Sequence, residues 1–158
     1  MARVALVTGG MGGLGEAICI KLAALGYKVV TTHSPGNTKA HEWLQTMNNM
    51  GYGFKAFPCD VADFDSCKAC VEQVVKEVGP VDVLVNNAGI QHVAKVENFP
   101  VERWDAIIAI NLSSAFHASR LALPAMRAAN WGRIINVASV HGLVGSAEKS
   151  AYVTAKHG

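Results

Sequence analysis

The stretch VALVTGGMGGLG, residues 4–15, decides the fold of this chain. Residues 4–7 are a short, continuous apolar run, which is typical of a strand buried on both faces. Five of the next eight residues are glycines, and apolar residues at helical spacing then continue to Gly26, which predicts a helix that ends there. A strand, a glycine loop and a helix in this order place bare backbone N–H groups where they can bind a pyrophosphate.

Two glycine registers fit this loop. The pattern GxGxxG at residues 10–15 is the general dinucleotide fingerprint, and TGxxxGxG at residues 8–15 is a wider one. Glycine is required because a side chain would block the approach of a ligand to the backbone. The alternative is a glycine-rich turn without a ligand, and the flanking strand and helix weigh against it.

The same alternation continues to the end of the chain. Apolar runs predict further strands, and amphipathic stretches between them predict helices. The strands are expected at residues 27–32, 54–57, 81–85 and 133–138, and the helices at 39–50, 66–78 and 104–119. We therefore expect an α/β fold, a doubly wound parallel sheet, in a single domain over residues 1–158.

The periodicity also predicts which helical side chains are buried. We expect Trp43 to pack in the core, and the third helix to turn four valines inward. These valines are Val71, Val74, Val75 and Val78. Phe116 and Asn111 lie on the inward stripe of the helix at 104–119. A buried amide must find partners, so Asn111 is either a satisfied core residue or the holder of a water beside an active site.

Composition excludes several classes of protein. The 158 residues are 51% hydrophobic and 16% charged, with a net charge of +2, which indicates a globular chain. Basic and acidic residues are interspersed, so we expect neither nucleic-acid binding nor a basic membrane patch. No uninterrupted apolar run reaches the ~18 residues of a membrane span, and no signal peptide is visible, so we expect a cytoplasmic protein. The pair Cys67 and Cys70 falls within a predicted helix, which favours structural cysteines over a redox or metal site.

The nucleotide-binding end of the chain leaves two questions open. NAD sites usually carry an acid near the end of the second strand, but no Asp or Glu occurs between Glu16 and Glu42. NADP is therefore permitted, although the region offers His33, Lys39 and His41 rather than an arginine. Asp60 follows the third strand, where its carboxylate either accepts from an adenine amino group or caps the next helix.

A second group of reactive side chains lies near the end of the sequence. If residues 152–156 are helical, Tyr152 and Lys156 lie one turn apart on one face. A phenol ionises near ~10, and a neighbouring ammonium favours the phenolate, which makes it a usable base. Ser139 follows the predicted strand at 133–138, so its hydroxyl could face the same pocket. This set suits the exchange of one proton with a carbonyl oxygen.

With these motifs in order, the chain resembles the classical short-chain dehydrogenase/reductase family over its whole length. The motifs are Thr8-Gly9-x-x-x-Gly13-x-Gly15, Asp60, Asn86-Asn87-Ala88-Gly89, Asn111, Ser139 and Tyr152-x-x-x-Lys156. The resemblance implies that Tyr152 is the acid/base, that Lys156 lowers its pKa and binds the nicotinamide ribose, that Ser139 orients the substrate oxygen and that Asn111 holds a relay water. The cofactor contacts that it implies are Gly9, Gly13, Leu14, Gly15, Asp60, Val61, Asn87, Ala88, Gly89, Tyr152 and Lys156.

Two subfamilies are visible within this resemblance. Residues 1 to about 80 resemble bacterial acetoacetyl-CoA reductases, which use NADPH, and the remainder resembles D-3-hydroxybutyrate dehydrogenases, which use NAD. The second resemblance implies that Gln91, His141 and Lys149 bind a substrate carboxylate, alongside Ser139 and Tyr152. A free acid needs such a cation and donors. We therefore expect a 3-hydroxybutyrate dehydrogenase, with acetoacetyl-CoA reduction as the alternative and the choice between NAD and NADP open.

The end of the chain and the resemblance carry further expectations. Family members continue beyond the position of Gly158 with further strands and a substrate lid, so the fold is expected to be truncated after the fifth strand. We expect little or no turnover from residues 1–158 alone, and a non-catalytic nucleotide-binding fragment is the second alternative. The resemblance further implies a homotetramer for the full-length protein and a small-molecule substrate.

Overall fold

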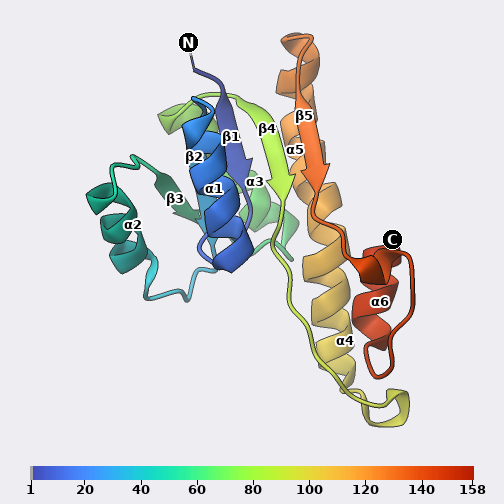
Figure 1. Ribbon diagram of the computed structural model, residues 1–158. Coiled ribbons are helices and arrows are strands. Elements are labelled where there is room, and N and C mark those ends of the chain that lie inside the picture. Colours follow the sequence, from blue (N-terminus) through green and yellow to red (C-terminus); the bar gives the residue numbers. More distant parts are fainter. Residues whose placement is uncertain (1) are drawn as a thin grey trace.

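The computed structural model describes residues 2–158, and its centre is a five-stranded sheet in which every strand pair is parallel. The strands are β1 (Val4–Val7), β2 (Lys28–His33), β3 (Lys55–Pro58), β4 (Val81–Asn86) and β5 (Arg133–Asn136). Their order is β3-β2-β1-β4-β5, so the chain moves outward from β1 and then returns to its other side (Figure 1). The prediction of a doubly wound α/β sheet is confirmed, and the order reverses between β1 and β4.

Helices alternate with these strands as predicted. They are α1 (Gly13–Ala24), α2 (Ala40–Asn49), α3 (Phe64–Glu77), α4 (Val101–Ile108), α5 (Ser114–Ala128) and α6 (Ser150–His157). Two 3₁₀ turns, η1 (Val96–Asn98) and η3 (Val140–Gly142), and a π-helical turn, η2 (Ala109–Ser113), complete the chain. Because η2 joins α4 to α5, the three form one helical stretch that extends beyond the sheet toward α6 (Figure 1).

The two faces of β1 carry two separate cores, because successive side chains of a strand point to opposite faces. Val4 and Leu6 belong to the core under α3 and α5, which also contains Cys67 and Cys70. Ala5 and Val7 belong to the core under α1, with Cys19 and Val29 among their neighbours. Cys67 and Cys70 are free thiols buried in the first core, which agrees with a structural role.

Two predicted core residues are instead exposed. Val75 is 45% exposed because Val74 already occupies the inward position, and the next residue of a helix points about 100° away from it. Phe116 is 62% exposed because the wider π turn of η2 rotates every later position of the stripe. After this turn Ala118 and Ala122 take the buried positions. Trp43 is half-buried and stacks on Phe54 at a ring separation of 5.8 Å.

The sequence contains no uninterrupted apolar run long enough to span a membrane, but Val101–Ala128 forms one long helical stretch that is apolar on average. By length and composition alone, this 28-residue helical stretch could cross a membrane, and 22% of its apolar window is buried. Core helices of globular proteins pass the same test, and α5 packs against β4 and α3. Trp104, Phe116 and Leu123 are exposed apolar side chains of this stretch.

Candidate active site

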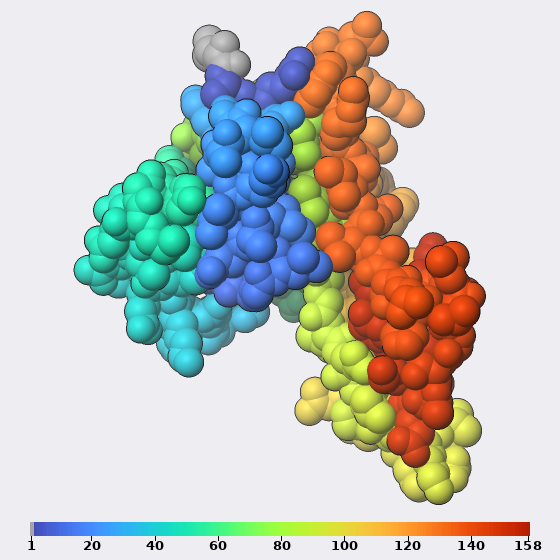
Figure 2. All heavy atoms as spheres, in the orientation of Figure 1, coloured from blue at the N-terminus to red at the C-terminus, as the bar shows by residue number. Residues whose placement is uncertain are grey.

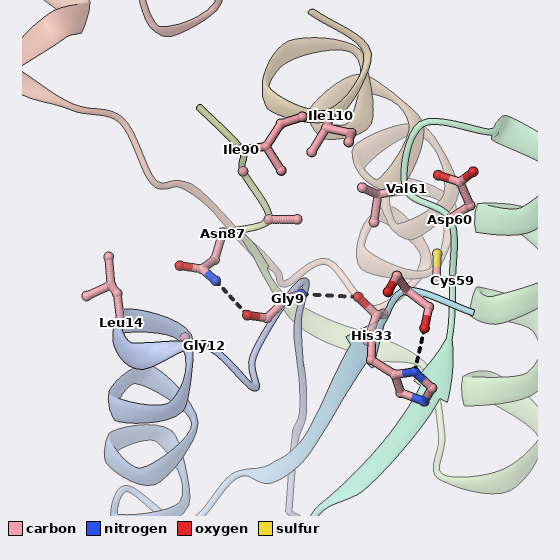
Figure 3. Close-up of a pocket in the computed structure, with 15 residues that line it drawn as sticks. Gly9, Gly12, Leu14, His33, Cys59, Asp60, Val61, Asn87, Ile90 and Ile110 are labelled. Atoms are coloured by element: carbon pink, nitrogen blue, oxygen red, sulfur yellow. Dashed lines mark hydrogen bonds between the residues drawn. The ribbon is translucent and has the colours of Figure 1, made fainter. Parts of the chain in front are cut away.

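A cleft of about 350 Å³ lies at the carboxyl ends of the strands, where the sheet order reverses. Parallel α/β sheets bind ligands at this position. The cleft is lined by the glycine loop, the ends of β2, β3 and β4, and one residue of η2 (Figure 3). Its lining residues are Gly9, Gly12, Leu14, Gly15, Thr32, His33, Ser34, Cys59, Asp60, Val61, Asn87, Ala88, Gly89, Ile90 and Ile110.

Most of the sequence-predicted cofactor residues line this cleft. Those that do are Gly9, Leu14, Gly15, Asp60, Val61, Asn87, Ala88 and Gly89. Gly13 begins α1 directly beside it, and Tyr152 and Lys156 lie on α6, outside its lining. Gly12 belongs to the predicted GxGxxG pattern, whereas five further lining residues were not predicted as contacts: Thr32, Ser34, Cys59, Ile90 and Ile110. The signal that could have found four of them is position, since Thr32, Ser34, Cys59 and Ile90 lie at or just after the carboxyl ends of strands.

The glycines of the loop divide into two kinds. A Cβ atom on Gly15 would lie 2.5 Å from the carbonyl oxygen of Gly9, so the fold itself requires glycine there. Gly9 has a φ of +65°, which glycine adopts more readily than other residues. In contrast, a Cβ on Gly12 or Gly13 would meet no atom within 4 Å. The space over the start of α1 is therefore open to a ligand, as a pyrophosphate on a helix N-terminus needs.

The glycine loop is fixed to the loop after β4 by one buried hydroxyl and one amide. The Thr8 Oγ1 accepts hydrogen bonds from the backbone N–H groups of Asn87 and Ala88, both at 3.0 Å. The Asn87 Nδ2 donates to the carbonyl oxygens of Thr8 and Gly9 at 3.0 and 3.1 Å (Figure 3). The Asn87 amide thus holds one wall of the cleft against another.

Asp60 and Val61 form the opposite wall (Figure 3). Asp60 Oδ1 accepts from the backbone N–H of Ala62 at 3.0 Å, and its own N–H donates to Ser66 Oγ. The side chain that caps α3 is that of Asp63, which accepts from the Ser66 N–H. Asp60 is therefore not the capping residue, and its Oδ2 atom makes no hydrogen bond within residues 2–158.

The end of β2 carries no carboxylate into the cleft. Thr32 Oγ1 accepts from the backbone N–H of Gly9 at 3.2 Å, and the His33 ring lies against the carbonyl oxygen of Ser34. Of the three basic candidates, only His33 lines the cleft. Lys39 lines a neighbouring cavity of about 460 Å³ between α1 and α2, and His41 is exposed on α2.

On α6, the structure brings Tyr152 and Lys156 together as the i,i+4 spacing predicts. The Lys156 Nζ lies 5.7 Å from the centroid of the Tyr152 ring and donates to the carbonyl oxygen of Val137 at 2.8 Å. Burial lowers the pKa of Lys156 from its usual value of 10.5. Val137 in turn donates its N–H to the Asn86 carbonyl at 2.9 Å, so this pair is tied to the end of β4.

His141 and Lys149 extend the group around Tyr152. The Lys149 Nζ lies 3.4 Å from His141 Nε2, and the His141 ring meets the Tyr152 ring edge-on at 6.0 Å. Because an ammonium only donates, this contact places the ring proton on Nδ1, which is buried without a partner among the described residues. Ser139 Oγ accepts from the His141 N–H at 3.2 Å. Gln91 is exposed on the loop after β4, outside this hydrogen-bonded group of residues 2–158.

Asn111 lies in the π turn, and both ends of its amide are used. Its Oδ1 accepts from the N–H of Ile90 and its Nδ2 donates to the carbonyl oxygen of Ile90, both at 2.8 Å. The satisfied-amide interpretation therefore accounts for this residue structurally. One N–H of the amide remains for a further partner. π turns are frequent at functional sites, and this one connects α4 to the cleft wall at Ile90.

Comparison with known proteins places this geometry in a family. The family model for short chain dehydrogenase matches residues 3–158. The chain belongs to this family. The expected resemblance is thus confirmed. Members of this family use NAD or NADP. The glycine loop and the α6 residues described above both lie within the stretch that the family model matches.

Similar proteins come from both expected subfamilies. The chain is 49% identical over 157 residues to a D-beta-hydroxybutyrate dehydrogenase of Cupriavidus necator, covering 99% of this chain and 60% of that protein. It is 44% identical to a D-beta-hydroxybutyrate dehydrogenase of Rhizobium meliloti, covering 100% and 62%. An acetoacetyl-CoA reductase of Cupriavidus necator is 42% identical, covering 99% and 63%. The chain thus spans between 60% and 63% of the length of these three relatives.

Proposed function

We propose that this chain is the nucleotide-binding part of an NAD(P)-dependent oxidoreductase acting on a short 3-hydroxy or 3-oxo acid, and that its substrate is 3-hydroxybutyrate. The observation that carries this proposal is the pairing of Lys156 with Tyr152 on α6, tied through Val137 to the end of β4. It brings a proton-exchanging pair to the carboxyl edge of the sheet that holds the cleft. The 49% identity to a D-beta-hydroxybutyrate dehydrogenase supports the choice of substrate.

The cleft residues fit a nicotinamide dinucleotide. Open space over Gly12 and Gly13 at the start of α1 suits the pyrophosphate. Gly9, Gly13, Leu14 and Gly15 would hold it, Asp60 and Val61 would contact the base, and Asn87, Ala88 and Gly89 would lie beside the nicotinamide half. The chemistry supplied by a bound nicotinamide is the acceptance or donation of a hydride.

The residues of α6 and η3 would handle the proton and the substrate. Oxidation of a 3-hydroxy acid releases a hydride from carbon 3 and a proton from its hydroxyl, and Tyr152 would take this proton. Lys156 would stabilise the phenolate by its charge, Ser139 would orient the reacting oxygen, and Asn111 would hold a water through its remaining N–H.

The substrate carboxylate would lie against the His141 and Lys149 pair. Lys149 supplies a cation that lies 3.4 Å from His141 Nε2. Both are within the group around Tyr152, so they suit an acid whose carboxylate is close to the reacting carbon. Gln91 would complete this contact from the loop after β4.

A second candidate is the reduction of acetoacetyl-CoA with NADPH. Two observations favour it, namely the 42% identity to an acetoacetyl-CoA reductase and the absence of a carboxylate from β2 in the cleft lining. A thioester has no charge for Lys149 to bind, which favours the free acid. The third candidate is a non-catalytic nucleotide-binding fragment, in which the α6 group would have no chemical role.

Binding and turnover test these candidates separately. Calorimetric titration of residues 1–158 with NAD and NADPH should give binding of at least one cofactor, and the lack of both would contradict the proposal. Turnover of 3-hydroxybutyrate with NAD is compared with turnover of acetoacetyl-CoA with NADPH. Both reactions are measured on residues 1–158 and on a chimera in which this chain is followed by the C-terminal segment of the 49%-identical relative that the match does not cover. In the active chimera, Tyr152→Phe should lower kcat by ~10²- to 10⁴-fold while cofactor affinity is kept. Unchanged turnover would support the fragment hypothesis.

A homotetrameric full-length protein in the cytoplasm completes the proposal. Phe116 and Leu123 are exposed and line one surface cavity on α5, which supports self-association through this helix. The four buried free cysteines agree with a reducing compartment. Analytical ultracentrifugation of the chimera and its Phe116→Ser variant tests the assembly, and identical sedimentation of the two would argue against this surface of α5.

A further inference from the structure

The His117 side chain links α5 to the base-binding wall of the cleft. Its Nδ1 lies 3.3 Å from the carbonyl oxygen of Val61, although the two residues are 56 positions apart. A carbonyl oxygen only accepts, so the histidine must donate, and its proton lies on Nδ1. The ring is half-buried and packs edge-on against Phe64 at 5.6 Å.

The carbonyl that His117 holds belongs to the same peptide group as the N–H that holds Asp60. The peptide unit between Val61 and Ala62 carries the Val61 oxygen at one end and the Ala62 N–H at the other, and this unit is planar. The Ala62 N–H donates to Asp60 Oδ1 at 3.0 Å. Fixing the carbonyl end therefore fixes the direction of the N–H that orients the carboxylate.

We infer that His117 is a positioning residue for recognition of the adenine base, acting through the Val61–Ala62 peptide on the Asp60 carboxylate. This inference rests on the proposed function, because it takes the base of a dinucleotide as the ligand of Asp60 and Val61. With Oδ1 occupied by the peptide N–H, Asp60 presents Oδ2 to an amino group. His117 does not line the cleft, so it touches no ligand and acts only through this peptide.

The other donor to the Val61 carbonyl limits the size of the expected effect. The Cys67 Sγ lies 3.5 Å from the same oxygen, and a thiol is a weak donor. Loss of His117 therefore loosens the peptide group rather than freeing it completely. Only one neutral hydrogen bond is lost, so we expect affinity for an adenine nucleotide to fall by about 3- to 10-fold.

The test compares two halves of the cofactor on residues 1–158. His117→Phe keeps a ring against Phe64 and removes the donor, whereas His117→Asn places an amide N–H close to the position of Nδ1. Competition titrations should show weaker binding of AMP by His117→Phe, recovery by His117→Asn, and unchanged binding of reduced nicotinamide mononucleotide by both. Arg120→Gln is the matched control, because it removes the cation that lies 5.2 Å over the Phe64 ring and keeps the hydrogen bond.

A double-variant cycle separates positioning from general loosening. If His117 acts through Asp60, His117→Phe should have no further effect on AMP binding in an Asp60→Ala background. Equal losses in both backgrounds, or an equal loss in Arg120→Gln, would overturn this inference while cofactor binding by the unaltered chain stands. A chain that binds no adenine nucleotide would overturn the proposed function and this inference together.

Nuclear magnetic resonance of the unaltered chain provides a second measurement that needs no variant. Long-range nitrogen–proton couplings should place the neutral His117 proton on Nδ1. A neutral ring protonated on Nε2 would contradict the donor assignment, whatever the variants do.

Discussion

Replacing Thr8 by valine should destabilise the chain by removing the acceptor that joins the glycine loop to the loop after β4. Thr8 is 5% exposed, and its Oγ1 is the acceptor for the N–H groups of Asn87 and Ala88. Valine has nearly the same shape as threonine, so packing is preserved and both N–H groups lose their partner. The third contact, from the hydroxyl to the Val85 carbonyl, is long at 3.4 Å and adds little.

The magnitude follows from two part-buried donors. A fully buried unsatisfied N–H costs ~1–3 kcal/mol, and water can partly replace the lost acceptor beside the cleft, so Thr8→Val should lower the free energy of unfolding by about 2 kcal/mol. With a urea m-value of ~2 kcal/mol per M, the unfolding midpoint should fall by about 1 M. This loss is a sizeable part of the ~5–15 kcal/mol that typically stabilises a folded domain.

Urea unfolding followed by circular dichroism gives both values, and Thr8→Ser is the matched control. Serine keeps the hydroxyl and loses one methyl group, so it should cost about 1 kcal/mol or less. Because Asn87 and Ala88 line the cleft, Thr8→Val should also weaken cofactor binding, whereas Thr8→Ser should not. Unfolding free energies of the two variants within about 0.5 kcal/mol of each other would refute the reasoning.

Three further predictions use the same unfolding assay. Gly15→Ala should be strongly destabilised because its Cβ would lie 2.5 Å from the Gly9 oxygen. A Cβ on Gly13 meets no atom within 4 Å, so Gly13→Ala should be at least as stable as the unaltered chain but should bind cofactor more weakly. Equal stabilities of the two variants would contradict the division of the glycines into two kinds. Burial, and then the charge of a nearby carboxylate, raise the pKa of Cys19 from 9.0 to about 12. The folded chain therefore keeps a proton that the unfolded chain loses, and its stability relative to Cys19→Ala should fall as pH rises above 9, by at most ~1.4 kcal/mol per unit. Burial lowers the pKa of Lys156, so its folded form binds fewer protons just below pH 10.5, and the stability of the chain relative to Lys156→Met should rise with pH in that window; a flat difference would contradict the buried ammonium.

Much of the fold was predictable from the sequence because the central strands β1, β2 and β4 are buried on both faces. Continuous apolar runs such as residues 4–7 and 81–85 have no other placement in a chain of this composition, and the strands begin and end within two residues of the predicted bounds. The π turn was not predictable, because an apolar stripe at i, i+3, i+4 and i+7 continues across it without a break. The misplacement of Phe116 follows directly from that extra width.

The residue types at the candidate site were easier to predict than their contacts. Asn87 was expected at the cleft and lies there, but its Nδ2 donates to the glycine loop. This contact depends on β4 being the neighbour of β1, and no local pattern in residues 81–89 specifies the neighbour of a strand. His117 and Val61 are 56 positions apart, and their contact depends on the packing of α5 beside α3.

The α6 pair is held by the packing of α6 on α4 and η2, where Ala151 and Ala155 are buried against Ile107, and by one hydrogen bond toward the sheet. The Lys156 ammonium is held by the Val137 carbonyl, and the Val137 N–H is held by Asn86 at the end of β4. Residues 143–148, which lie between η3 and α6, are exposed and contribute only the Glu148 carbonyl to the hydrogen bonds outside their own turn. Figure 2 shows the C-terminal part of the chain, in red, within a lobe that projects away from the N-terminal part. Substitutions between 143 and 148 should therefore leave the Lys156–Val137 hydrogen bond in place, which the pH dependence of stability relative to Lys156→Met would report.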